Sequence, residues 1–163
     1  MKQQTLLVPL DGSDLAEVAL AKAAELAEMM EGSKLLLLRA AEAHTLPGVD
    51  PTEAQVRVVR ETERYLAAVA DRLQRKGIQN IQTSMWYGAP AASIVEAARF
   101  YKVDLIVMST HGRSGLGQLI LGSVAQSVIH STTTPILLVR QPEAPLQPPQ
   151  GAGQTREQKR SPD

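Results

Sequence analysis

The chain has 163 residues, which is enough for one domain with a substantial core. Its 17 basic and 17 acidic residues cancel, so no overall charge attracts nucleic acid or an anionic membrane, and we expect neither as a partner. Cysteine is absent and the 3 histidines lack metal-ligand spacing, which excludes disulfides, thiolate nucleophiles and cysteine-ligated zinc.

The first predicted element is a strand at residues 5–10, a continuous apolar run typical of a strand buried on both faces. Because Pro9 and Asp11 interrupt this run, it is too short for the apolar region of a signal peptide. No stretch of the sequence approaches the length of a membrane-spanning helix. We therefore expect a cytoplasmic protein.

A helix is expected next, over residues 15–30, where apolar residues recur at three- and four-residue steps. Asp14 and Glu17 resemble a capping box at the start of this helix. Met29 and Met30, at its end, are expected to pack in the core.

The middle of the chain predicts a strand, a helix and another strand. The apolar run 35–38 predicts a second buried strand, and residues 52–76 predict a longer helix that closes at Gly77. The run 81–86 alternates apolar and polar residues, which is typical of an edge strand.

The last predicted elements again alternate helix and strand. Pro90 is well placed in the first turn of a third helix, and the apolar run 105–108 predicts a fourth strand. A short helix follows Gly122, and Ile136–Val139 forms the last apolar run.

This alternation predicts an α/β fold with right-handed crossovers. We expect a single open five-stranded parallel sheet with helices on both faces. Residues 1–140 are expected to form this one domain. Residues 141–163 are rich in proline and glutamine, and we expect them to be a disordered tail.

The segment that is most informative for function runs from residue 108 to residue 124. Four glycines within eleven residues let its backbone take positive φ angles and approach a ligand closely. Gly122, Ser123 and Val124 would present backbone amides at a helix N-terminus, where the helix dipole favours an anion. Arg113 adds a positive charge that could reach a phosphate.

Neither common phosphate-binding motif explains this segment. It is not a Walker A loop, because no lysine lies between Gly122 and Ser123. It is not the GxGxxG motif either, and it does not follow the first strand. On composition alone, a ligand-free surface loop is an open alternative.

Two motifs of the sequence resemble those of the ATP-binding universal stress proteins. The family pattern G-x2-G-x9-G-[S/T] corresponds to Ser109-x2-Gly112-x9-Gly122-Ser123, with serine in place of the first glycine. The family's opening motif corresponds to Val-Pro-Leu-Asp-Gly-Ser at residues 8–13. The resemblance covers about residues 3–140. It implies a Rossmann-like fold, similar to the adenine nucleotide alpha-hydrolases, with strand order 3-2-1-4-5.

The resemblance also implies how an adenosine would be held. Asp11 resembles the acid that contacts the ribose hydroxyls or lies near metal-bound phosphates, although a turn-forming aspartate is the alternative. The backbone of Ala40 would hydrogen-bond to the adenine ring. Pro9 and Leu10 would line the same pocket.

The phosphate roles follow from the second motif. By resemblance, Ser109 and Gly112 would lie against the α- and β-phosphates, and Gly122 and Ser123 against the β- and γ-phosphates. Val124 would supply a backbone amide. The implied ligand is ATP, or ADP or AMP, with a Mg²⁺ or Mn²⁺ ion bridging the phosphates.

The geometry of open α/β sheets supports this placement. With strand order 3-2-1-4-5, the direction of winding reverses between strands one and four, and ligands bind at the carboxyl ends beside such a point. Asp11 and the segment that begins at Ser109 follow those two strands.

We therefore interpret the chain as a regulatory nucleotide-binding module in stress response rather than an enzyme. The resemblance implies a homodimer that pairs through the edge strand Ile136–Val139. Three alternatives stay open: a slow ATPase or autokinase, a nucleotide-free dimeric scaffold, and an FMN-dependent carrier. The first lacks a Walker lysine and a clear general base.

Overall fold

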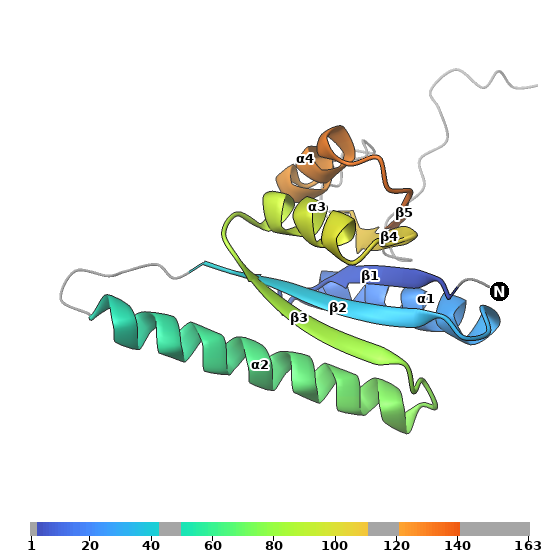
Figure 1. Cartoon of the computed structure of the whole chain (residues 1–163), viewed down its shortest axis with the longest axis horizontal. Coiled ribbons are helices and arrows are strands. Elements are labelled where there is room, and N and C mark those ends of the chain that lie inside the picture. Colours follow the sequence, from blue (N-terminus) through green and yellow to red (C-terminus); the bar gives the residue numbers. More distant parts are fainter. Residues whose placement is uncertain (1–2, 43–49, 111–120, 141–163) are drawn as a thin grey trace, which may run out of the picture.

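The computed structural model describes residues 3–42, 50–110 and 121–140. Over this part of the chain, strands and helices alternate without exception (Figure 1). In chain order they are β1 (Thr5–Pro9), α1 (Asp14–Met29), β2 (Lys34–Ala41), α2 (Pro51–Arg75), β3 (Ile81–Tyr87), α3 (Pro90–Phe100), β4 (Leu105–Ser109), α4 (Ser123–Ser131) and β5 (Ile136–Val139).

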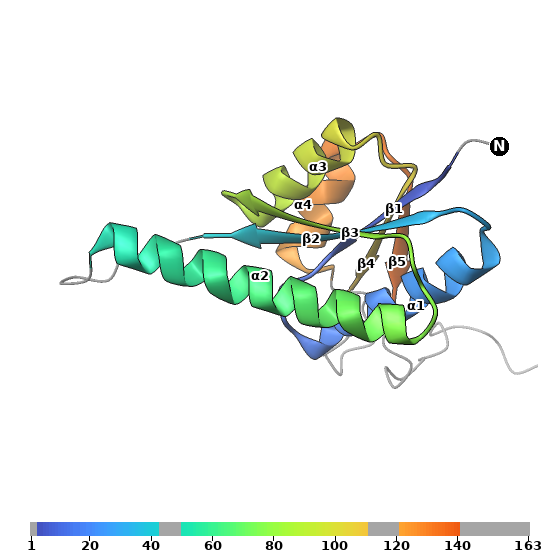
Figure 2. The same cartoon turned by 60° about the horizontal axis from the view of Figure 1, so that its bottom comes forward.

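The strands form one parallel sheet in the order β3-β2-β1-β4-β5, which confirms the predicted fold and strand order. β3 lies at an edge, as its alternating sequence indicated. From β1 the chain adds β2 and β3 on one side, and then returns to add β4 and β5 on the other. The winding therefore reverses between β1 and β4. Figure 2 shows the twist that turns β5 away from the direction of β3.

Both faces of the sheet are covered, because side chains of the central strands point alternately to the two sides. Leu6 and Val8 of β1 pack with α1 and α2, whereas Leu7, between them, packs with α3 and α4. All three side chains are fully buried. Figure 1 shows the same layering, with α1 and α2 on one side and α3 and α4 on the other. Burial on both faces is why these strands are continuously apolar.

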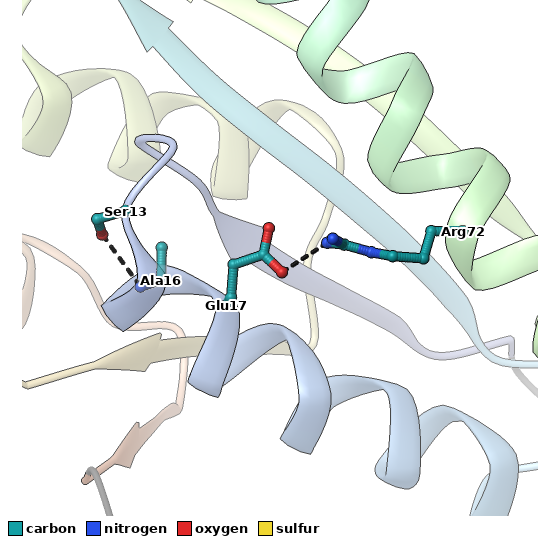
Figure 3. Close-up of polar contacts among 4 residues, drawn as sticks. All are labelled: Ser13, Ala16, Glu17 and Arg72. Carbon is teal, nitrogen blue, oxygen red and sulfur yellow. Dashed lines mark hydrogen bonds and ion pairs between the residues drawn. The ribbon is translucent and has the colours of Figure 1, made fainter.

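The start of α1 differs from the predicted capping box. The N-cap is Ser13, whose hydroxyl accepts a hydrogen bond from the amide of Ala16 at 3.2 Å (Figure 3). A φ of +85° at Gly12 turns the chain sharply just before this residue, so Ser13 is the first residue that can cap. Glu17 therefore lies one position beyond the residue that completes a capping box, and its carboxylate pairs with Arg72 of α2 at 2.5 Å instead.

The expectation for Met29 was wrong. Its side chain is 81% exposed because the last turn of α1 directs it to solvent, whereas Met30 packs against the core as expected. The other helix expectations hold to within one residue. Pro90 opens α3 and Gly122 is the N-cap of α4.

The predicted tail at residues 141–163 lies outside the described residues. Within the three described ranges, no helix combines the length and the hydropathy that a bilayer crossing requires.

Candidate functional site

A pocket opens at the carboxyl edge of the sheet, between the ends of β1 and β4. The helices that follow these two strands pack on opposite faces, α1 on one and α4 on the other, and their separation leaves a crevice at this point. The pocket has an empty volume of about 820 Å³, open solvent at its mouth included.

The pocket brings together the predicted site residues that the structure describes. They come from the ends of β1, β2 and β4 and from the start of α4: Pro9, Leu10, Asp11, Ala40, Ser109, Gly122, Ser123 and Val124. Gly112 and Arg113, the other two predicted site residues, lie outside the described residues.

The sequence interpretation missed the apolar floor of the pocket. Leu38, Ile94 and Met108 line it and are each at most 7% exposed. The other lining residues that were missed are Ser13, Leu15, Ala16, Pro90 and Ala125. A signal existed for part of this floor, since Leu38 and Met108 lie just before predicted site residues on strands that were identified. An apolar floor of this kind suits a flat ring better than a charged group.

The pocket also includes the start of α4, which offers backbone amides. Gly122 is the N-cap, and its carbonyl accepts the first helical bond from Gln126 at 3.0 Å. The amides of residues 123–125 therefore have no acceptor within the helix. No side chain in the described part of the chain caps this end. The helix dipole and these amides favour an anion here.

Two other helices also begin at the pocket, but they offer less to an anion. The start of α1 is already capped by the hydroxyl of Ser13. The start of α3 also lacks a side-chain cap, but Pro90 has no amide hydrogen to donate, which leaves one donor fewer than at α4. Of the three helix starts at the pocket, α4 therefore offers the most unpaired amides.

Asp11 forms the turn that leads from β1 into α1. Its Oδ1 accepts a hydrogen bond from the amide of Ser13 at 2.9 Å, which is an Asx turn. Asp11 therefore does form the turn, which is the alternative role that the sequence left open for it. Asp11 also lines the pocket, and its carboxylate has a second oxygen that this bond does not use. Among the described lining residues it is the charged one.

Ser109 replaces the first glycine of the family pattern without backbone strain. It is the last residue of β4 and pairs in register with Val139 of β5. The amide of Thr110, the next residue, donates to the carbonyl of Val139 at 3.0 Å. Ser109 is not among the described residues with positive φ, so this position does not need glycine.

The described part of the site has no cluster of side chains that could form a metal centre from protein alone. In the described ranges, no group of three or more histidine, cysteine, aspartate or glutamate side chains is arranged to hold a metal ion. Any cation at this pocket would need further oxygen ligands from a bound molecule.

The sheet order and the crevice at its switch point define a doubly wound α/β protein with a pocket at the carboxyl edge of its sheet. The profile of the universal stress protein family matches residues 3–140, and the chain belongs to this family.

Individual relatives agree with this assignment. The universal stress protein MJ0531 of Methanocaldococcus jannaschii is 32% identical over 143 residues, which cover 85% of this chain and 82% of the relative. The solved structure of the hypothetical protein MJ0577 has a TM-score of 0.72 at 26% identity, covering 85% of this chain and 96% of that one. A universal stress protein solved in complex with cAMP has a TM-score of 0.66 at 27% identity, covering 83% and 96%.

Proposed function

We propose that this protein binds an adenine nucleotide, ATP or a related one, in the pocket between β1 and β4, and that it acts as a regulatory module in the cytoplasm. One observation carries the proposal: an apolar floor and an uncapped helix N-terminus face the same pocket. The floor suits a base and the amides suit phosphates. The related protein that was solved with cAMP supports an adenine nucleotide as the ligand class.

The proposed orientation places the base beside β2 and the phosphates beside α4. Adenine would contact the backbone of Ala40, with Pro9 and Leu10 alongside. The phosphates would meet Ser109 and the amides of Ser123 and Val124. Gly112 and Arg113 belong to the same proposal, at positions outside the described residues.

The proposed cation is Mg²⁺ or Mn²⁺ held mainly by the phosphates. One carboxylate, that of Asp11, faces the pocket among the described lining residues, and one of its oxygens already accepts a hydrogen bond. This donor set fits a hard cation that completes its shell with phosphate oxygens and water, and it does not fit a cation held by protein alone.

The variant Gly122→Asp tests the phosphate end of the site. Gly122 has φ −59° and ψ 152°, which aspartate adopts readily, and aspartate is a favoured N-cap residue. Its carboxylate would accept the amides that a phosphate needs and would repel the phosphate. We expect the variant to fold and to lose ATP binding in calorimetry.

Ser127→Asp is the matched control. It adds the same charge at an exposed position of α4 that does not line the pocket. We expect it to bind ATP as the wild type does. Unchanged ATP affinity in Gly122→Asp would show that the site is misplaced. Rapid turnover of ATP by the wild type would argue against a regulatory binder.

We further propose a two-fold dimer that pairs through β5. This strand lies at a sheet edge, and all four of its apolar residues remain only half-buried in the single chain. An apolar edge of this kind invites pairing with another strand.

A further inference from the structure

Arg39 lies beside the pocket on β2, with its side chain on the face of the sheet that α1 and α2 cover. It precedes Ala40 on β2, and because side chains alternate along a strand, Arg39 points toward α1 and α2 while Ala40 lines the pocket. Its guanidinium carbon lies 4.8 Å from the centre of the Tyr65 ring of α2. This is a cation–π contact, which holds the planar group in a defined orientation.

The same guanidinium faces the turn that carries Asp11, across the space that a single side-chain atom at Gly12 would occupy. A Cβ placed on Gly12 would lie 3.7 Å from Nη1 and 3.8 Å from Nη2 of Arg39, at van der Waals distance. The turn therefore has the pocket on one side and Arg39 on the other. Movement of the turn away from the pocket would bring it up against the Arg39 guanidinium, which is stacked on Tyr65.

The charges around Tyr65 agree with this arrangement. Burial raises the pKa of Tyr65 above its ordinary value, and the negative charges of Glu17 and Asp11 raise it further, whereas Arg39 lowers it. Asp11 and Arg39 thus act on the same phenol. The stronger acidic neighbour, Glu17, is already paired with Arg72 (Figure 3).

We propose that Arg39 is a positioning residue for the nucleotide pocket: stacked on Tyr65, it braces the turn at Gly12 from behind and so fixes where the Asp11 carboxylate meets the ligand. This inference rests on the proposed function. Arg39 does not line the pocket, and it acts through Asp11.

Calorimetric titration of the full chain with ATP tests the inference. Arg39→Met keeps the length and apolar packing of the side chain but removes its charge and its planar group. We expect it to weaken ATP binding about ten-fold, the size of one charge-assisted contact. Arg39→Lys keeps the charge without the planar stack, and we expect a smaller loss.

A double-mutant cycle separates positioning from general destabilisation. If Arg39 acts through Asp11, then Arg39→Met should weaken binding no further once Asp11→Ala is present. Arg72→Met is the matched control, because it removes an arginine on the same face that contacts α1 at Glu17. We expect it to leave the affinity for ATP unchanged.

The outcomes separate this inference from the proposed function. A wild-type chain that binds ATP, with Arg39→Met and Arg39→Lys equal to it, overturns the positioning role alone. An equal loss from Arg39→Met with and without Asp11→Ala also overturns it. A wild-type chain that binds no adenine nucleotide overturns the proposed function, and the inference with it.

Discussion

At the scale of single residues, Lys102 takes an unfavourable backbone conformation at the end of α3. Its φ of 52° is left-handed, and its amide donates to the carbonyl of Arg99 while that of Val103 donates to Ala98. This is a Schellman motif, whose left-handed position favours glycine. Lys102→Gly should raise the free energy of unfolding by about 0.5–1 kcal/mol, as measured by urea denaturation.

The control is Lys102→Ala, which removes the charge but keeps the Cβ atom. We expect it to match the wild type to within about 0.5 kcal/mol. A stabilisation by alanine equal to that by glycine would mean that the lysine charge, and not the backbone, is the cause.

Tyr65 has a buried phenolic oxygen for which the described residues provide no hydrogen-bond partner. Removing an unsatisfied buried hydroxyl while keeping the ring should cost nothing. We expect Tyr65→Phe to be as stable as the wild type or more stable, by up to about 1 kcal/mol. The cation–π stack with Arg39 would remain. A clear loss of stability in thermal unfolding would show that the hydroxyl has a partner.

The pH dependence of Tyr65→Phe follows from the raised pKa of Tyr65, which lies above its ordinary value of 10.0 chiefly through burial. Because the unfolded chain then loses this proton before the folded chain does, the wild type should lose stability as the pH rises above about 10 and through the raised pKa. Tyr65→Phe should lack this part of the alkaline loss. Parallel stability curves for the two proteins over that range would contradict the burial of the phenol.

At the scale of secondary-structure elements, the structure places the cap of α1 on Ser13. Ser13→Ala should therefore lower the free energy of unfolding by about 1 kcal/mol, since it leaves the Ala16 amide without its acceptor. Asp14→Ala is the comparison, because Asp14 was the cap expected from sequence and acts only through its charge in the first turn. Chemical denaturation should show a larger loss for Ser13→Ala, and the reverse order would restore the sequence-based cap.

The elements themselves could be predicted from sequence because their signals are local. Continuous apolar runs marked the buried strands, and proline and glycine marked the ends of helices to within one residue. The N-cap of α1 could not be predicted, since the positive φ angle of Gly12 determines whether Ser13 or Asp14 is the N-cap residue. The burial of Met29 could not be predicted either, because it depends on which side of α1 faces the sheet.

The candidate site was predictable only in part, for a related reason. Motifs next to strand ends placed Asp11 and Ser109 at one edge of the sheet, once the strand order was implied by family resemblance. The apolar floor includes Ile94, which lines the pocket only because α3 packs against β2. The contact between Arg39 and Tyr65 joins β2 to α2, and no local sequence pattern predicts it.

At the scale of the whole molecule, the proposed dimer gives a prediction about mass. Pairing through Ile136–Val139 would extend the sheet across a two-fold axis and cover an apolar edge. Light scattering coupled to size exclusion should find twice the chain mass of 17.6 kDa. A single-chain mass at all concentrations would show that the β5 edge stays open.

The central claim is that the crevice between β1 and β4 holds a nucleotide with its phosphates at the start of α4. A crystal structure of the protein grown with ATP and Mg²⁺ tests this most directly. The account predicts the base against Leu38, Ile94 and Met108, and phosphate oxygens within hydrogen-bond distance of the amides of residues 123–125. An empty crevice, or a nucleotide bound elsewhere on the chain, would contradict it.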